Sequence, residues 1–236
     1  MSTHRRGPFP WPDAIIFDLD GTLVDSLPDL GGSLNALLQE HGLEPRPYDV
    51  IRDMIGHGTR KLVERGFASH GIALDAEGLE ARTERFMQIY APRAARETRP
   101  FPAVAETVMA LAEAGVPLGV CTNKPTRVSA DILFQLGLID GFQAIVGGGF
   151  EGLPGKPHPA LLLRTADLLG VTPDRALLVG DSAADVGAAR AAGMPVLVLA
   201  YGYTTTPPWE LGADGVVPNF SALMGVISAL KWTRAA

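Results

Sequence analysis

The sequence predicts an α/β fold: a doubly wound parallel sheet with an inserted α-helical cap domain. Five short runs that are apolar at nearly every position recur along the chain, and a helical pattern follows each run. Such runs suit parallel strands covered on both faces, and their alternation with helices indicates βαβ units. One long segment, residues 27–96, contains no strand-like run and is predicted to be the helical insertion.

The elements of the sheet unit follow in order along the chain. Its strands are predicted at Ala14–Asp18, Val116–Thr122, Ala144–Gly147, Ala176–Asp181 and Pro195–Ala200. Its helices are predicted at Ala103–Ala114, Thr126–Leu136, Pro159–Leu169 and Ala184–Ala192. A glycine directly follows each of these helices, which is typical of a helix C-terminus. A short strand near Val216–Val217 and a last helix at Phe220–Leu230 complete this unit.

The inserted segment is predicted to be helical throughout. Its helices are expected at Asp29–His41, Asp49–Ile55, Thr59–Ala68 and Ala76–Tyr90. Leu34, Leu37 and Leu38 recur at the spacing of one helix face. The segment is too long for a single crossover, so we expect a cap domain at 27–96, with hinges near Val24–Pro28 and Ala94–Pro102. The catalytic core would then comprise residues 13–26 and 97–236, after a flexible leader at 1–12.

Composition excludes several classes of partner. The 236-residue chain has a formal net charge of −6 and no basic stripe, so nucleic acid is not expected as a partner. Its single cysteine, Cys121, allows no disulfide within one chain and favours a reducing compartment. The sequence has neither a signal-peptide pattern nor an apolar run of membrane-spanning length. We therefore expect a cytoplasmic protein with no membrane partner, and both a monomer and a homodimer stay open.

The first predicted strand ends in two carboxylates, Asp18 and Asp20, followed by a glycine. Side chains alternate along a strand, so these two acids are expected to point the same way. Two solvated acids at a turn would explain the short pattern alone. A phosphoryl-transfer site explains it better, because one carboxylate can attack, the other can move the proton, and a divalent cation can hold both. By position, attack is assigned to Asp18 and proton transfer to Asp20.

Polar residues also lie at the ends of other predicted strands or in the loops that follow them, where ligands bind in sheets of this type. Thr122 offers a hydroxyl to a phosphate oxygen, and Lys156 offers a charge that would offset the nucleophile. Asp181 and Asp185 flank a strand-to-helix turn and can face one point together with Asp18, as oxygen ligands of Mg²⁺. Taken singly, these residues would equally suit a helix cap, a loop lysine and a first-turn helix acid.

Together these residues form four motifs in a characteristic order. They are D-x-D-G-T at Asp18, the strand-end Thr122, K-P-x-P at Lys156, and G-D-S-x-x-D at Asp181. This set resembles the haloacid dehalogenase-like superfamily of aspartate-nucleophile phosphatases. The resemblance implies an aspartyl-phosphate on Asp18, phosphoryl binding by Thr122, charge neutralisation by Lys156, and acid–base catalysis by Asp20. It also implies Mg²⁺ held by Asp18, the backbone carbonyl of Asp20, Asp181 and Asp185, the last directly or through water.

Smaller sequence features resemble one group within that superfamily, the phosphoglycolate phosphatases. They include Val24-Asp25-Ser26, Thr122-Asn123-Lys124 and Tyr201-Gly202-Tyr203. The resemblance implies a phosphoric monoester hydrolase of small phosphorylated metabolites, with 2-phosphoglycolate the best single substrate. A phosphomutase like β-phosphoglucomutase and another sugar-phosphate phosphatase are the alternatives within the enzyme class. A non-catalytic module that binds a phosphorylated metabolite is the alternative outside it.

Substrate choice is expected to involve the cap. Gly56, His57 and Gly58 form a tight loop that enters a helix, whose N-terminus could receive a substrate carboxylate. Arg60 is the candidate for direct charge pairing, against the alternative of an exposed helix face. With these, Thr122, Asn123 and Lys156 complete the predicted substrate-binding residues.

Overall fold

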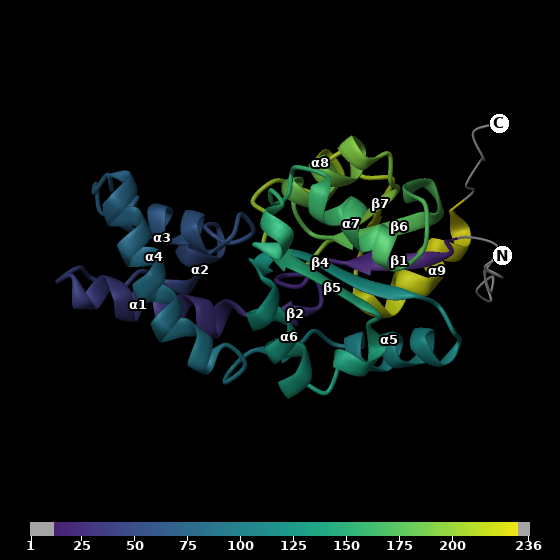
Figure 1. Cartoon of the computed structure of the whole chain (residues 1–236), viewed down its shortest axis with the longest axis horizontal. Helices are drawn as coiled ribbons and strands as arrows, with labels where there is room; N and C mark the ends of the chain where they lie inside the picture. Colours follow the sequence, from purple (N-terminus) through teal and green to yellow (C-terminus); the bar gives the residue numbers. More distant parts are fainter. Residues whose placement is uncertain (1–11, 231–236) are drawn as a thin grey trace.

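The structure of the chain is a computed structural model that describes residues 12–230. The predicted leader, residues 1–12, lies outside the described residues apart from Pro12. Two units lie next to each other in Figure 1: the helical insert on the left, and the sheet with its covering helices on the right.

The main sheet has six parallel strands in the order β5-β4-β1-β6-β7-β8. The strands are β1 (Ala14–Phe17), β4 (Leu118–Pro125), β5 (Ala144–Gly148), β6 (Ala176–Gly180), β7 (Val196–Leu199) and β8 (Gly215–Val217). The first strand is central, and Ile15 pairs with Leu118 on one side and with Leu177 on the other. Chain order runs outward from β1 in both directions, so the carboxyl ends of β4, β1 and β6 meet at the switch point.

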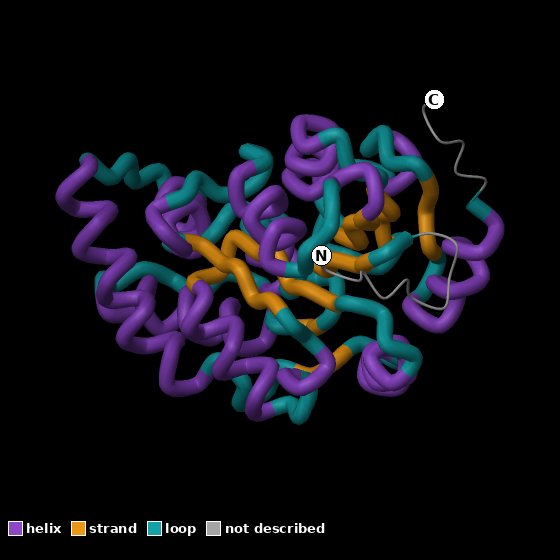
Figure 2. Tube along the Cα trace, turned by 45° about the vertical axis from the view of Figure 1, so that its right-hand side comes forward, coloured by secondary structure: helices purple, strands orange, loops and turns teal. Residues whose placement is uncertain are grey.

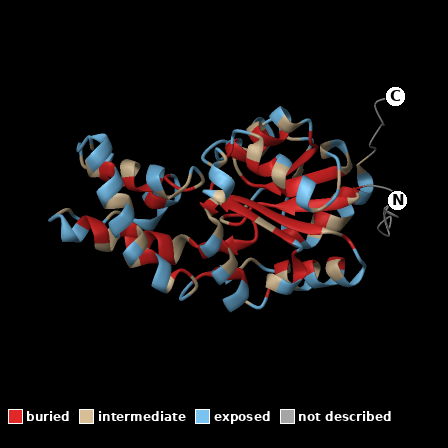
Figure 3. Ribbon diagram, viewed as in Figure 1, coloured by how far each residue is buried: buried red, intermediate tan, exposed pale blue. Residues whose placement is uncertain are grey.

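Helices cover both faces of this sheet, as Figure 2 shows. They are α5 (Val104–Glu113), α6 (Thr126–Gln135), α7 (Ala160–Leu168), α8 (Ala183–Ala192) and α9 (Leu223–Ala229). Successive residues of β1 serve opposite faces: Phe17 packs in the cluster of α5 and α9, and Ile16 packs in the cluster of α7 and α8. The predicted doubly wound sheet is confirmed, and buried residues run along its strands in Figure 3.

The helical insert, α1–α4, packs around an apolar cluster that also includes Val128 and Ile132 of α6 and Tyr203. Its helices are α1 (Leu27–Glu40), α2 (Tyr48–Arg52), α3 (Thr59–Ala68) and α4 (Ala76–Tyr90). Leu34, Leu37 and Leu38 are fully buried against Phe86 and neighbouring apolar side chains, as their spacing predicts. The expected insertion of a helical unit is therefore confirmed.

Two short strands that the sequence analysis did not predict connect the insert to the sheet unit. They are β2 (Val24–Asp25) and β3 (Arg99–Pro100), and they pair antiparallel. Beside them, a carboxylate oxygen of Asp29 accepts hydrogen bonds from the backbone N–H groups of Glu97 and Thr98, at 2.9 and 2.8 Å. The two connections of the insert are thus tied to each other where hinges were expected.

Short 3₁₀ turns complete the described structure. They are η1 (Ala91–Arg93), η2 (Ile139–Gly141), η3 (Phe150–Gly152), η4 (Pro173–Arg175), η5 (Pro208–Glu210) and η6 (Phe220–Ala222). The first strand ends at Phe17, one residue earlier than expected, because the chain turns there: the N–H of Asp18 still bonds to Val179, and the N–H of Leu23 bonds back to Leu19. No helix within residues 12–230 is long and apolar enough to cross a membrane.

Candidate active site

Four of the residues predicted for catalysis or metal binding lie at one edge of the main sheet. Asp18 follows β1, Thr122 lies in β4, Asp181 follows β6, and Asp185 lies in the first turn of α8. These strands are neighbours and parallel, so their carboxyl ends share this edge. All four side chains are buried.

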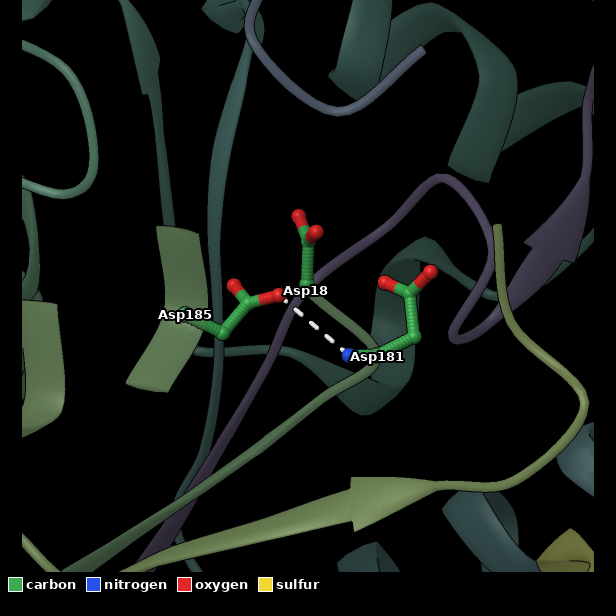
Figure 4. Close-up of side chains that lie close together, drawn as sticks. All are labelled: Asp18, Asp181 and Asp185. Atoms are coloured by element: carbon green, nitrogen blue, oxygen red, sulfur yellow. Dashed lines mark hydrogen bonds between the residues drawn. The ribbon is translucent and has the colours of Figure 1, made fainter. Parts of the chain in front are cut away.

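Three carboxylates form a compact acidic cluster. One oxygen from each of Asp18, Asp181 and Asp185 lies within 4.8 Å of the others, and Figure 4 shows the three side chains next to one another. Burial raises the pKa of Asp18 to about 7, against the attraction of Lys156. Burial and the two neighbouring carboxylates also raise the pKa of Asp181. Such shifts arise where like charges are kept from water, and a cation would relieve them.

Local hydrogen bonds hold Asp181 and Asp185 in place. The backbone N–H of Tyr203 donates to Asp181 at 2.6 Å. Ser182 caps α8, and its N–H and hydroxyl donate to Oδ2 of Asp185 at 3.0 and 2.6 Å. Gly180 is required beside them, because a Cβ there would lie 2.4 Å from Cγ of Asp185. Asp185 is therefore both the helix-capping acid and a member of the cluster.

Lys156 is the counter-charge at the centre of the cluster. Its ammonium lies 2.8 Å from Oδ1 of Asp18 and 2.6 Å from Oδ1 of Asp185, and it donates to the carbonyl of Cys121 at 2.8 Å. These bonds use all three N–H donors of the ammonium. Burial disfavours the charge, but the two carboxylates outweigh it and raise the pKa of Lys156. Asn123 fixes the loop by accepting from the N–H of Lys156 at 2.7 Å.

Asp20 lies apart from this cluster and pairs with a second buried lysine, Lys124. The ammonium of Lys124 is 2.9 Å from Oδ1 of Asp20 and donates to the hydroxyl of Tyr90 at 2.6 Å. Ser26 donates to the same Asp20 oxygen at 2.5 Å. Burial opposes the charge on Lys124, but Asp20 and Tyr90 together outweigh this effect and raise the pKa of the lysine. Burial also raises the pKa of Tyr90 to about 12.

Sequence reasoning missed the roles of Lys124 and Tyr90. Lys124 follows Thr122 and Asn123 within the same strand, and that position was the only signal for it. Tyr90 ends a helix of the insert, and nothing in the sequence connects it with Asp20. Asp20 thus contacts a lysine that also bonds the last helix of the insert.

A pocket opens above these residues, between the sheet unit and the insert. From the sheet unit it is lined by Asp18, Asp20, Thr122, Asn123 and Lys124. From the insert it is lined by Leu30, Ile55, Gly56, Gly58, Thr59 and Leu62. The amide of Asn123 donates to the carbonyl of Gly56 at 3.2 Å and so joins the two sides. Asp18 and Asp20 both line this pocket.

Three residues predicted to bind substrate do not line this pocket: Lys156, which is buried beside Asp18, and His57 and Arg60 of the insert. His57 is exposed, and Arg60 faces Glu80 of α4 at 3.7 Å, with side chains 54% and 63% exposed. The reason is helical geometry: Thr59 faces the pocket, and the next residue along a helix points about 100° away. The glycines of the same loop, Gly56 and Gly58, do line the pocket.

Comparison with known proteins shows the family of the chain. The model of the haloacid dehalogenase-like hydrolases, a hydrolase family, matches residues 12–193, and the chain belongs to that family. The predicted recognition and fold class are confirmed.

Among curated relatives, the chain is 43% identical over 206 residues to a phosphoglycolate phosphatase of Caulobacter vibrioides, covering 87% of this chain and 86% of the relative. It is 44% identical over 216 residues to one of Rhodospirillum rubrum, covering 90% and 89%. The crystal structure of a predicted phosphoglycolate phosphatase from Haemophilus somnus 129pt matches with a TM-score of 0.83 at 33% identity, covering 93% of this chain and 99% of that one. These relatives confirm the expected class of enzyme, a phosphoric monoester hydrolase.

Proposed function

We propose that this chain is a Mg²⁺-dependent phosphatase that hydrolyses 2-phosphoglycolate to glycolate and phosphate through an aspartyl-phosphate on Asp18. The relatives named phosphoglycolate phosphatase support the substrate. The single observation that carries the chemistry is the placement of Asp18, which is buried beside Lys156 and Asp181 yet lines the pocket.

The acidic cluster fits a magnesium ion. Asp18, Asp181 and Asp185 offer only carboxylate oxygens, the ligand type that Mg²⁺ prefers, and Lys156 balances just one of their three charges. An uncompensated charge away from water is costly, so a cation suits the donor set. When bound, Mg²⁺ would supply positive charge to the nucleophile and to the phosphoryl oxygens.

Asp18 is arranged as the nucleophile. Its Oδ1 accepts from the N–H of Leu19 at 2.7 Å and from Lys156. Among the described residues, no hydrogen-bond donor contacts Oδ2, which leaves that oxygen free to attack phosphorus. Attack forms the bond from Asp18 to phosphorus and breaks the bond from phosphorus to the ester oxygen. Thr122 would donate its hydroxyl to a phosphoryl oxygen during this step, and the charge of Lys156 beside Asp18 would offset the negative charge that gathers there.

Asp20 is arranged to move the proton. Its Oδ1 is anchored by Lys124 and Ser26, and Oδ2 has no hydrogen-bond partner among the described residues. In the first step Asp20 gives its proton to the leaving ester oxygen, so that glycolate departs neutral at that atom. In the second step Asp20 takes a proton from the water that attacks phosphorus, which releases phosphate and restores both acids.

The helical insert would act as the cap domain. We assign it residues 27–96, with the core at 13–26 and from 97 onward, because α1–α4 share one apolar cluster and paired strands join the two parts. Asn123 and Gly56 would meet the substrate at the boundary between the two parts. Contacts of His57 and Arg60 with substrate stay predictions that need a rearrangement of their loop. Location in the cytoplasm also stays a prediction.

The test is release of free phosphate with Mg²⁺ from a panel of 2-phosphoglycolate, sugar phosphates, nucleotides and pyrophosphate. The proposal predicts the highest kcat/KM for 2-phosphoglycolate. A preference for another ester would keep the chemistry and reject the substrate. Conversion of a sugar phosphate to its isomer without phosphate release would show a mutase, and metal-dependent binding without any turnover would show a binding module.

A further inference from the structure

One cation lines the pocket among the described residues, and it is Lys124 rather than Lys156. Lys124 lies at the end of the pocket that holds Asp20, whereas Lys156 lies beneath Asp18. The transferred phosphoryl group and the leaving group therefore face different lysines.

The ammonium of Lys124 has a donor to spare. Lys124 is 4% exposed, and its ammonium has two hydrogen-bond partners among the described residues, Oδ1 of Asp20 and the hydroxyl of Tyr90, whose ring centroid lies 4.7 Å away. An ammonium carries three N–H donors, so one of them is unpaired. A buried cationic donor without a partner is costly, and an anionic ligand in the pocket would satisfy it.

The other side of the pocket offers further donors. Helix α3 begins after Gly58, and no side chain caps it. Its first N–H groups have no partner within the helix, and the helix dipole places partial positive charge there. Gly58 and Thr59 line the same pocket as Lys124. The remaining pocket lining from the insert consists of apolar side chains and Gly56.

We propose that Lys124 and the N-terminus of α3 form a subsite for a second anionic group of the substrate, separate from the phosphoryl group. This inference rests on the proposed function and deepens it, because it names the residues that bind the carboxylate of the substrate. Nζ of Lys124 lies 2.9 Å from the acid that protonates the ester oxygen, so the second anion must lie close to that oxygen. The subsite thus selects phosphate esters of short hydroxy acids.

The test measures a preference within each enzyme preparation. For the wild type, Lys124→Met and Lys124→Gln, kcat/KM is measured for 2-phosphoglycolate, 3-phosphoglycerate and ethyl phosphate, which lacks a carboxylate. The kcat/KM for each carboxylate-bearing substrate is divided by the kcat/KM for ethyl phosphate. This ratio does not depend on the fraction of enzyme that is folded. We expect this ratio to be high in the wild type and to fall about 10- to 100-fold in both variants. Arg164→Met, in a surface ion pair of α7, is the control and should keep the ratio.

The outcomes separate the inference from the proposed function. If the variants lose activity equally on all three substrates, Lys124 serves only to position Asp20 and the inference is wrong. A wild type without preference for a carboxylate also rejects it, while the phosphatase chemistry stands. A wild type that prefers 3-phosphoglycerate, with a ratio that depends on Lys124, supports the subsite and rejects 2-phosphoglycolate as the substrate. An enzyme that hydrolyses none of the esters rejects both.

Discussion

Two buried lysines divide the acidic groups of the site between them. Lys156 holds Asp18 and Asp185, and Lys124 holds Asp20. In both Asp18 and Asp20 the lysine occupies Oδ1, so that Oδ2 stays available toward the pocket. In the proposed mechanism, attack and proton transfer therefore belong to two carboxylates that are paired with different lysines.

Replacing Asp20 should impair protonation of the leaving group more than attack by the nucleophile. We expect Asp20→Asn to lower kcat for 2-phosphoglycolate by about 100- to 10,000-fold, the usual contribution of general acid–base catalysis. The loss in the first step should be smaller for p-nitrophenyl phosphate, whose leaving group departs without a proton. Burst kinetics with both substrates measure this difference. Asp140→Asn, an exposed acid in η2, is the control, and an equal loss of the first step with both substrates would contradict the assignment.

The strand-end acids could be predicted from the sequence, and the second lysine could not. Asp18, Asp181 and Asp185 follow apolar runs whose ends must meet in a parallel sheet, so their meeting could be expected before the structure. Lys124 carries no comparable signal, because its burial depends on Asp20 and on Tyr90 from a distant helix. Arg60 is exposed because of the way α3 is rotated about its axis. The position of Arg60 in the sequence does not reveal this rotation.

At the scale of elements, the loop between α2 and α3 determines how the insert meets the sheet unit. Gly58 has a φ of +83°, and a Cβ there would lie 3.3 Å from the carbonyl oxygen of Asn123. The loop therefore approaches the end of β4 as closely as a glycine allows, and Gly56 accepts a bond from the same asparagine.

A matched pair of glycine variants tests this contact. Gly58→Ala should lower the free energy of unfolding by about 1–3 kcal/mol through its backbone conformation. It should also raise KM for the substrate, because the insert must move away from Asn123. Gly71→Ala, with φ of +75° and open space around it, should lower stability but keep KM. Urea unfolding and steady-state kinetics measure both effects, and equal KM values in the two variants would count against the closed contact.

The elements themselves could largely be predicted. The strands β4, β5, β6 and β7 follow from apolar runs, since each must bury both faces. The order of strands in the sheet depends on long-range packing, and the local pattern does not contain it. The paired strands β2 and β3 have two residues each, too few for any periodicity to be visible.

At the scale of the whole molecule, the insert and the acidic cluster are linked through one loop. Arg52 of α2 donates to the carbonyls of Tyr201 and Gly202, at 2.9 and 2.6 Å. The next residue, Tyr203, donates its N–H to Asp181. Hydrogen bonds of this loop therefore connect α2 of the insert with Asp181 of the acidic cluster.

The stability of the metal-free protein should fall as pH rises, and bound Mg²⁺ should oppose this fall. The pKa of Asp18 rises from 3.8 to about 7 on folding, so the metal-free native state binds more protons than the unfolded state between these values. Its stability should then fall as pH rises through this window, by a few kcal/mol at about 1.4 kcal/mol per pKa unit. Bound Mg²⁺ favours the ionised acids, so its stabilising effect should be larger at pH 8 than at pH 6.

Thermal unfolding at both pH values, with EDTA or with Mg²⁺, measures this linkage. Asp18→Asn should weaken the decline of metal-free stability with pH, because the variant lacks the titrating group. A decline of equal size in the variant would show that other groups cause it.

The central claim is that Asp18 carries the phosphoryl group during turnover. The most direct measurement mixes the Mg²⁺-loaded enzyme with 2-phosphoglycolate, quenches it with acid within the first turnovers, and determines peptide masses. We predict that the peptide containing Asp18 gains a phosphoryl group that hydroxylamine removes, and that Asp18→Asn shows neither this adduct nor turnover. Phosphate release with no adduct on Asp18, or normal turnover by the variant, would contradict the account.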